Sequence, residues 1–416
     1  MQTISNSKER LRLDFYGWRI VGLMLGPRAA GTGVYIMGGT LFLIPLEESL
    51  GLSRSVASLL FAAGTLVNGA TAILSGVLMD RFGPRKILIV SVLIATIGYV
   101  LFALSNNVVL VFIFYVGLIS PVILNVAYNA SAAFVNNWFD RQKATAMSLL
   151  QVGSGVGALI LIPALAFSID AWGWRYAAIV GAGAILVLGL PTALLSRNHP
   201  EEMGLLPDGV APDPVGSGPL QMTGPTAREA IKTPTFWMLT ATVAAFGAAQ
   251  TGMQVHFVPI MVWKGIDEIE GALVLTVSAA SSIPMVVIMG WLADRLGRLR
   301  VVAATSVIVL SGIMLLILTD PTWTIWVAAL LIAPGYGMYP LLWALVGQAF
   351  GRRSFSTIRG AMMGAVLPVT VGLPLIAGIT FDLTDSYAPT LWAMAALWAV
   401  SATVPLVAKI KSPTGS

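Results

Sequence analysis

The sequence has 416 residues, of which 57% are hydrophobic and only 10% are charged. So few charged side chains cannot cover the surface of a water-soluble protein, which excludes a soluble globular enzyme or binding module. The formal net charge of +5 belongs to loops between apolar stretches, so it is no sign of nucleic-acid binding. The chain has no cysteine, which excludes disulfides and thiolate metal sites.

Apolar stretches close to the length that spans a bilayer recur along the whole chain. We therefore predict an all-α membrane protein with twelve transmembrane helices, arranged as two pseudo-symmetric halves of six helices each. The first half is predicted to hold helices at 17–46, 53–79, 84–104, 108–138, 141–169 and 174–195. The second half is predicted to hold helices at 234–263, 269–293, 299–318, 323–350, 356–381 and 386–408.

A polar segment, 196–233, separates the half at 1–195 from the half at 234–416, and its prolines and glycines predict a flexible cytoplasmic tether. The lysines and arginines lie on alternate loops, with four exceptions among 24: Arg28, Arg54, Arg175 and Lys264. The positive-inside rule then places both termini and the tether in the cytoplasm. We expect a multi-pass protein of the plasma (inner) membrane without a cleavable signal peptide.

An eight-residue motif occurs once in each half. Gly76-Val-Leu-Met-Asp80-Arg81-Phe-Gly83 recurs as Gly290-Trp-Leu-Ala-Asp294-Arg295-Leu-Gly297, and both copies follow the second helix of their half. The first glycine of each copy lets a neighbouring helix approach closely. The aspartates are expected to pair either with local arginines or with the positive N-terminal end of a neighbouring helix. Contacts of this kind must break when the two halves move, so we expect a gating role.

Arg28 is the only charged residue that the sequence places deep inside a predicted helix, and such residues usually mark a transport path. Counting along the helices puts Tyr128, Gln151 and Tyr339 at the same depth. Two alternatives stay open: Arg28 extends to the interface or binds helix-end carbonyls, and each tyrosine is a packing residue. An aromatic wall with few donors suits a small carboxylate with an apolar tail. The candidate pocket residues are Arg28, Tyr35, Asn125, Tyr128, Gln151, Tyr336, Tyr339 and Trp343.

The repeated Gly–Asp motif resembles the loop between helices 2 and 3 throughout the major facilitator superfamily. Five other stretches are distinctive: Tyr16-Gly17-Trp18-Arg19, Trp138-Phe139-Asp140-Arg141, Pro200 to Gly209, Lys232 to Trp237, and His256-Phe257-Val258-Pro259. Together they resemble the prokaryotic branch of the monocarboxylate transporter family, close to the oxalate:formate antiporter group. The resemblance implies a major facilitator fold, a small organic anion as substrate, no cofactor, and a motif that closes the cytoplasmic side in the outward-open state. It also implies that His256 contacts the substrate or a proton.

The chain departs from that family at two positions. Val286 stands where family members often have an arginine, and Val366 lies near the position of a lysine in the oxalate group. We therefore expect monocarboxylates to be preferred over dicarboxylates. No carboxylate appears at mid-membrane depth, so His256 is the first candidate for carrying a proton, and Asp382, near the outer end of its helix, is the second.

We expect a secondary active transporter that moves a small monocarboxylate by alternating access, as a monomer in the lipid bilayer without metal or cofactor. Proton coupling, anion exchange and uncoupled transport stay open, as do the acid and the direction. The alternatives are a multidrug or lipophilic-compound exporter and a non-transporting sensor. The missing membrane-embedded acid argues against the exporter, and the short tails argue against the sensor. Nothing points to an enzyme, because no nucleophile–base pair, metal cluster or phosphate loop stands out.

Overall fold

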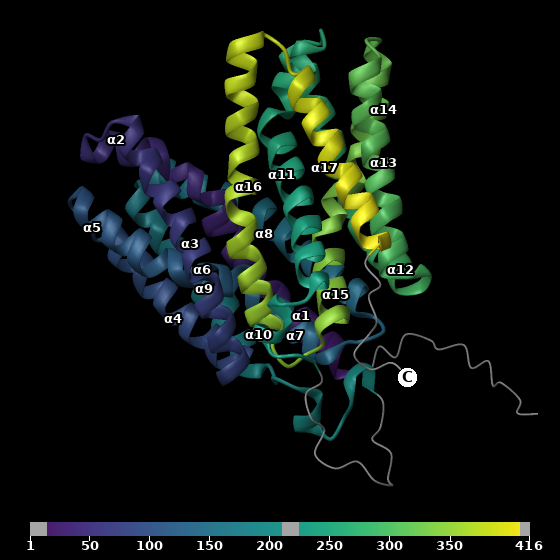
Figure 1. The fold of residues 1–416 in the computed structure, drawn as a ribbon. Coiled ribbons are helices and arrows are strands. Elements are labelled where there is room, and N and C mark those ends of the chain that lie inside the picture. The colour runs from purple at the N-terminus through teal and green to yellow at the C-terminus, as the bar shows by residue number, and fades with distance from the viewer. Residues whose placement is uncertain (1–14, 210–223, 408–416) are drawn as a thin grey trace, which may run out of the picture.

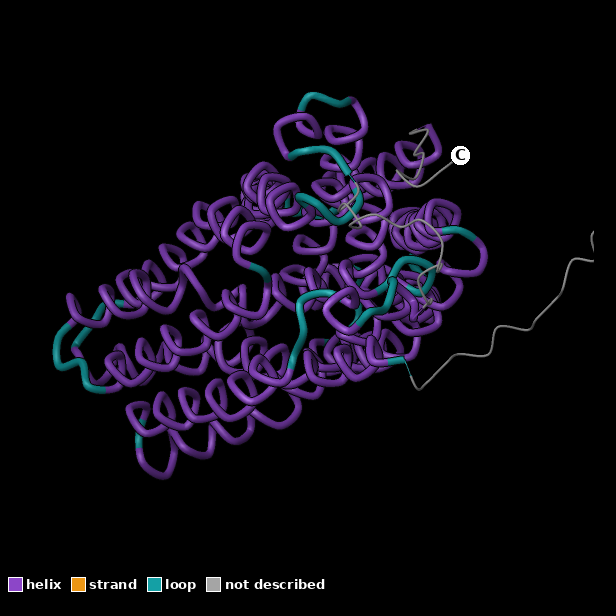
Figure 2. The backbone as a smooth tube through the Cα atoms, turned by 90° about the horizontal axis from the view of Figure 1, so that it is seen from below, coloured by secondary structure: helices purple, strands orange, loops and turns teal. Residues whose placement is uncertain are grey.

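A computed structural model of the chain describes residues 15–209 and 224–407. Within these ranges all regular elements are helices, as Figure 2 shows for the backbone. Ten of the helical stretches are long and apolar enough to cross a membrane. The prediction of an all-α membrane protein is therefore confirmed.

The helices up to residue 195 form what we call the N-terminal bundle. Its first predicted helix is interrupted by a π turn and a 3-10 turn, and its fourth predicted helix contains two π turns. The elements are α1 (Tyr16–Gly31), η1 (Thr32–Met37), η2 (Gly38–Phe42), α2 (Leu43–Leu50), α3 (Arg54–Phe82), α4 (Pro84–Ala103), α5 (Val108–Phe112), η3 (Ile113–Ile119), α6 (Ser120–Leu124), η4 (Asn125–Asn129), α7 (Ala130–Trp138), α8 (Lys143–Trp172) and α9 (Trp174–Leu195).

The helices from residue 234 onward form the C-terminal bundle, and three short helices lie between the bundles. The short helices are η5 (Pro200–Met203), η6 (Pro207–Gly209) and α10 (Ala227–Ile231). The C-terminal bundle contains α11 (Pro234–Trp263), α12 (Glu268–Leu296), α13 (Arg298–Leu318), α14 (Thr322–Ile332), η7 (Ala333–Gly337), α15 (Met338–Phe350), α16 (Phe355–Thr384) and α17 (Ala388–Val407).

The predicted helix positions agree with the observed ones to within a few residues. Two of the twelve, α11 and α17, are not among the ten stretches that qualify as membrane spans among the described residues. In α11, the polar side chains of Gln250, Gln254 and His256 lower the mean hydropathy. The count of twelve spans therefore stays a prediction for these two helices.

Helix ends coincide with residues that cap them. Gly83 and Gly297 follow α3 and α12 with φ of 85° and 97°, a backbone region that favours glycine. The side chains of Asn107 and Thr233 accept hydrogen bonds from the first turns of α5 and α11. The turns after the repeated motifs are therefore sharp, and they return the chain directly into the next helix.

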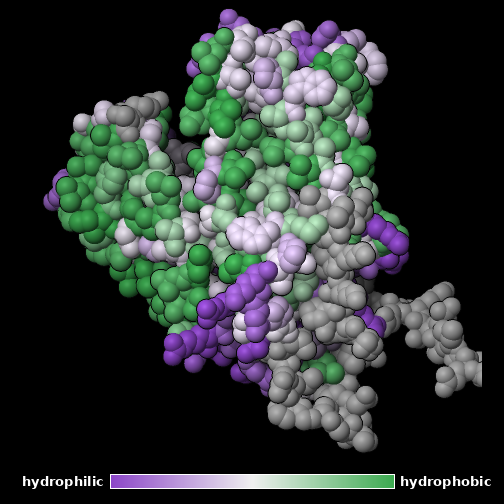
Figure 3. All heavy atoms as spheres, in the orientation of Figure 1, coloured by the Kyte–Doolittle hydropathy of each residue, from purple (hydrophilic) through white to green (hydrophobic). Residues whose placement is uncertain are grey.

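The two bundles meet at one end and diverge toward the other. Figure 1 shows most helices of the N-terminal bundle leaning away from the upright C-terminal bundle, and Figure 3 shows the hollow between them. The bundles pack together through α3 against α16 and through α8 against α12. We call the end where they meet the loop face, because it carries linker residues 196–209 and the turns that follow α3, α7, α12 and α15. The opposite end is the open face.

Residues 196–209 of the predicted tether make specific contacts with the loop face. The indole of Trp138 donates to the carbonyl of Arg197 at 2.9 Å, and Asn198 accepts from the backbone N–H of Arg85 at 2.9 Å. Glu201 forms a two-bonded ion pair with Arg352, at 2.7 and 3.0 Å. This pair connects the linker to the C-terminal bundle. The rest of the predicted tether falls partly on residues 210–223, outside the described part.

Candidate functional site

A cavity of about 340 Å³ lies between the bundles, on the open-face side of their contact. Its walls are mostly apolar, and among the residues described there Arg359 is the only charged one. Side chains from α3, η3 and η4 form one wall, and side chains from α15 and α16 form the other. The cavity therefore belongs to both bundles, and its shape must change if they move. The polar and aromatic lining includes Tyr35, Thr65, Asn68, Tyr115, Tyr128, Asn129, Tyr339 and Arg359.

Arg359 lies in the first two turns of α16 and is only 4% exposed. Its guanidinium donates to the Oδ1 of Asn129, from the other bundle, and to the hydroxyl of Tyr339 at 3.4 Å. The same guanidinium lies over the ring of Trp343 at 4.6 Å. Its Nε is buried without a hydrogen-bond partner. A buried cation with a free donor at the wall of a cavity is arranged to bind an anion.

Arg28 is equally buried, at 4% exposure, but it does not line the cavity. Three of its N–H groups are used inside the N-terminal bundle, on Ser154 at 3.0 Å, Ser131 at 3.2 Å and Gln151 at 2.7 Å. Its guanidinium lies 4.5 Å from the ring centre of Tyr128, which separates it from the cavity. Arg28 therefore supports the cavity wall from behind.

Tyr128 and Tyr339 meet across the two bundles in an edge-to-face contact, with ring centres 6.1 Å apart. Tyr339 in turn packs edge-to-face on Trp343 at 5.9 Å. Arg28 lies over the ring of Tyr128 and donates to Gln151 on the side away from the cavity. The structure thus brings together the four residues expected at one depth. Trp343 is buried beneath Arg359, and its indole N–H has no partner.

The π turn η4 explains how neighbouring residues reach different environments. Asn129 faces the cavity, whereas Asn125 is buried inside the bundle and donates to Ser75 at 3.3 Å and Ser91 at 3.2 Å. Asn129 also donates to Asn125 at 3.0 Å, so a chain of hydrogen bonds runs from Arg359 into the N-terminal bundle. Single π turns in long helices are frequent at functional sites.

The remaining predicted pocket residues are scattered. Tyr35 lines the cavity, and its hydroxyl bonds to Ser120 and Asn68, both at 3.0 Å. Tyr336 lies in η7, away from the cavity lining. Val286 and Val366, where the family pattern has cations, are buried apolar residues here.

Neither proton candidate lines the cavity. The ring of His256 bonds through Nδ1 to the hydroxyl of Tyr387 at 3.2 Å and through Nε2 to the carbonyl of Pro374 at 3.0 Å. The carbonyl can only accept, so Nε2 carries the proton of a neutral ring and Nδ1 accepts from Tyr387. Asp382 is exposed in the last turn of α16. The structure therefore places both residues apart from the arginines.

The first copy of the repeated motif joins α3 to the N-terminal end of α16. Asp80 accepts from the backbone N–H groups of Ser356 at 3.1 Å and Thr357 at 2.8 Å, and from the Thr357 hydroxyl at 2.6 Å. A methyl group on Gly76 would collide with the backbone of Ser356, so only glycine permits this approach. Arg81 is exposed and lies over Phe82, and Gly83 ends the helix.

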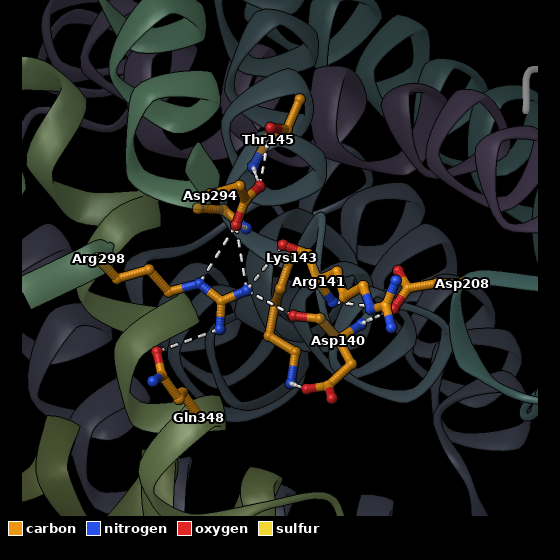
Figure 4. A network of polar contacts seen from close by, with 9 residues as sticks. Asp140, Arg141, Lys143, Thr145, Asp208, Asp294, Arg298 and Gln348 are labelled. Atoms are coloured by element: carbon orange, nitrogen blue, oxygen red, sulfur yellow. Dashed lines mark hydrogen bonds and ion pairs between the residues drawn. The ribbon is translucent and has the colours of Figure 1, made fainter. Parts of the chain in front are cut away.

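The second copy makes the equivalent contact between α12 and the N-terminal end of α8, as Figure 4 shows. Asp294 accepts from the backbone N–H groups of Ala144 at 3.1 Å and Thr145 at 2.7 Å. Gly290 lies against Ser148, and Arg295 stacks on Trp291 at 4.0 Å. Both aspartates thus cap a helix of the opposite bundle.

The two copies differ in one partner. Arg298 binds Asp294 at 3.1 Å and also donates to the backbone carbonyls of Asp140 and Arg141 (Figure 4). The corresponding position after Asp80 is Pro84, which has no charge to offer. The Asp294 contact therefore includes an ion pair that the Asp80 contact lacks.

Arg359 is the functional candidate that the sequence interpretation missed. It follows the start of its predicted helix by only a few positions, so the charge pattern counts it with the arginines of the preceding turn. The close packing of α3 on α16 buries this part of the helix. Its place inside an apolar stretch was the available signal.

Two helical bundles with a cavity between them, and paired contacts that close one face, define a helical membrane transporter rather than an enzyme. The chain belongs to the Major Facilitator Superfamily, whose family model matches residues 23–372.

Several known proteins are similar to this chain. Monocarboxylate transporter 11 of Homo sapiens is 25% identical over 285 residues, which cover 67% of this chain and 57% of that protein, so the chain spans just over half its length. The Mus musculus protein of the same name is 27% identical over 330 residues, covering 78% of this chain and 70% of that protein. A variant of the E. coli fucose:proton symporter FucP superposes with a TM-score of 0.72 at 14% identity, covering 96% of this chain and 99% of that chain. At that identity the likeness concerns the fold alone.

Proposed function

We propose that the protein is a secondary active transporter that moves a small monocarboxylate across the membrane by alternating access. One observation carries the proposal: among the residues that the structure describes, Arg359 is the one cation that lines an otherwise largely apolar cavity between the bundles. One guanidinium matches one carboxylate. A second carboxylate would have to lie against apolar walls, which is unfavourable. The names of the monocarboxylate transporter relatives support the same substrate class.

In this proposal the carboxylate binds Arg359, and the hydroxyls of Tyr128 and Tyr339 lie beside it. The apolar part of the substrate extends along Phe61, Met363 and Leu367, which line the same cavity. Arg28 and Gln151 contribute by fixing Tyr128 from behind. Both bundles contribute to binding, so their relative movement changes access to the substrate.

Alternating access would require the halves at 1–195 and 234–416 to move about the cavity, joined by 196–233. The contacts of Asp80 and Asp294 then hold the loop face closed while the cavity is reached from the open face. We propose that the loop face is cytoplasmic, because the linker and most lysines and arginines lie there, and that the protein works as a monomer in the inner membrane.

Proton coupling and anion exchange are both compatible with this site. His256 and Asp382 remain the proton candidates, although both lie away from Arg359. A proton acting there would have to change how the helices pack rather than touch the substrate.

The test is a thermal-shift screen of the purified protein against monocarboxylates such as lactate and benzoate and dicarboxylates such as oxalate and malonate. A ligand that binds only the folded state raises the melting temperature by mass action. Hits are then measured for uptake into proteoliposomes. We expect stabilisation and saturable uptake with monocarboxylates. Stronger stabilisation by dicarboxylates, or none by any carboxylate, would contradict the proposal.

A further inference from the structure

A second cavity, of about 280 Å³, lies at the loop face. Its walls come from the turn after α3, from linker residues Asn198 and His199, and from the turn between α15 and α16. Both bundles and the linker therefore surround it. It borders the contact between Asp80 and Ser356. Its lining shares Met79, Phe355 and Ser356 with that of the central cavity and otherwise consists of different residues.

The lining of this cavity is strongly basic. Three arginines, Arg81, Arg352 and Arg353, line it together with His199. The one acid in the lining is Asp80, whose two carboxylate oxygens are already used by N–H and O–H groups of α16. Asp80 carries one negative charge and Glu201 pairs with Arg352, so three arginines against two acids leave a net charge of about +1 at the cavity.

Two polar atoms here lack partners. Glu201 engages the two terminal nitrogens of Arg352, which leaves the Arg352 Nε buried and unbonded. The Nδ1 of His199 is also buried without a partner. Burial, followed by the charge of Arg352, lowers the pKa of His199 below its ordinary value, while Glu201 and Glu202 act in the opposite direction. Unsatisfied buried groups beside clustered arginines indicate a site for oxygen acceptors.

We propose that this loop-face cavity binds a phosphate group, either inorganic phosphate or that of a small phosphate ester. Guanidinium groups match phosphate oxygens in a two-bonded geometry, and several can share one phosphate. The volume suits a small ligand rather than a nucleotide-sized one.

Binding would have a consequence for conformation. The walls come from both bundles, so the cavity exists only while the loop face is closed. A ligand that binds one of two states better than the other shifts the population toward that state. Phosphate therefore stabilises the conformation in which the loop face is closed and the central cavity is reached from the opposite end. By binding at this separate site, it slows transport without occupying the substrate cavity.

The experiment measures the width of the open face in the full-length protein. The chain has no native cysteine, so a spin-label pair can be attached through Ile44→Cys on α2 and Leu383→Cys on α16, both exposed near the open face. Distances between the labels are recorded in phosphatidylcholine nanodiscs with inorganic phosphate or with chloride at equal ionic strength. We expect phosphate to increase the long-distance population and to raise the melting temperature.

Variants locate the effect. In the double variant Arg81→Gln/Arg353→Gln, each substitution removes a charged donor. The phosphate concentration that gives half of the maximal change in the distance distribution should therefore rise at least about tenfold. The control is the double variant Lys86→Gln/Arg300→Gln, which removes the same amount of charge from exposed positions outside the cavity. Its response to phosphate should equal that of the parent protein. Each variant is compared with its own distribution without phosphate.

Two further arms separate the sources of the phosphate group and the two cavities. The first arm uses phosphatidylglycerol nanodiscs without added inorganic phosphate. If the label distances increase in the parent protein but not in the double arginine variant, the occupant is a lipid phosphate at the same site. Arg359→Gln, in the central cavity, should keep the full phosphate response. The proposal is overturned if the parent protein does not respond, if the double arginine variant responds unchanged, or if Arg359→Gln loses the response.

Discussion

At the scale of single residues, Arg28 and Arg359 are both buried but have different surroundings. Arg28 has three hydrogen bonds to side chains of its own bundle, whereas Arg359 contacts Asn129 and Tyr339 and keeps a free Nε beside the cavity. Neither forms an ion pair with a carboxylate among the described residues. A buried charge without a counter-ion is unfavourable, so an anionic ligand would stabilise the site.

Arg359→Gln and Arg359→Lys should both weaken carboxylate binding at least about tenfold, because neither reproduces the fork of the guanidinium. Affinity is measured by thermal shift against ligand concentration. Arg300→Gln, on the exposed surface of α13, is the matched control and should bind normally. Normal affinity in Arg359→Lys would remove Arg359 from the site.

Arg28→Gln should act first on stability. The change removes the donor to Ser131 and Ser154 and the cation over Tyr128, which we expect to destabilise the fold by about 2–4 kcal/mol. The melting temperature without ligand should therefore fall in Arg28→Gln and stay close to that of the parent in Arg359→Gln. An unchanged melting temperature together with complete loss of binding would instead make Arg28 the direct ligand.

The sequence indicated part of this site and missed the rest for a physical reason. Tyr128, Tyr339 and Gln151 could be found because depth along a straight helix is counted from residue numbers. Counting cannot show which helix of the other half packs against a given turn. Arg359 is buried by such a contact, and Asn125 is turned inward by a π turn that no sequence rule predicted.

At the scale of elements, the closure of the loop face depends on close contact between α3 and α16. A methyl group on Gly76 would collide with the backbone of Ser356, and one on Gly360 would collide with the backbone of Ala72. The two glycines lie on opposite helices of the same pair, so each backbone fits into the space that the other glycine leaves. Small residues allow helices to pack this closely in membranes.

Gly360→Ala should therefore separate α3 from α16 and open the loop face. Overpacking costs about 1–3 kcal/mol, which changes the ratio of the two states by about fivefold to more than a hundredfold. The spin-label pair on Ile44→Cys and Leu383→Cys should shift toward shorter distances. Gly372→Ala lies on the same helix with open space around it and should leave the distribution unchanged.

At the scale of the whole molecule, the two residues proposed as proton carriers, His256 and Asp382, lie outside the lining of the central cavity. His256 joins α11 to α16 through Pro374 and to the start of α17 through Tyr387. Both nitrogens of its ring are bonded. Its position makes it part of the packing within the C-terminal bundle.

His256→Gln should lower the melting temperature while leaving the dependence of uptake on external pH as it was. Uptake is therefore measured over a range of external pH in the parent and in the variant. If His256 carries the transported proton, the pH dependence disappears in the variant, and the packing interpretation is then wrong.

The helix bundle itself was predictable from apolar length and breaker residues, since spans must satisfy their backbone hydrogen bonds internally. The linker was not. Its prolines and glycines are typical of a flexible segment, yet Trp138, Arg85 and Arg352 hold residues 196–209 in place. Those partners are distant in sequence, so composition alone could not reveal them.

The chemistry of the loop-face contacts determines which amino-acid substitutions preserve them. Asp80 and Asp294 bind backbone N–H groups of residues 356, 357, 144 and 145. Every amino acid except proline supplies that donor. Substitutions at Ser356 or Ala144 should therefore preserve the contact unless the new residue is proline, whereas the aspartates have no equivalent replacement. Residues 356 and 144 of the donating helices can therefore vary while the loop face still closes, whereas closure needs the charged acceptor at positions 80 and 294.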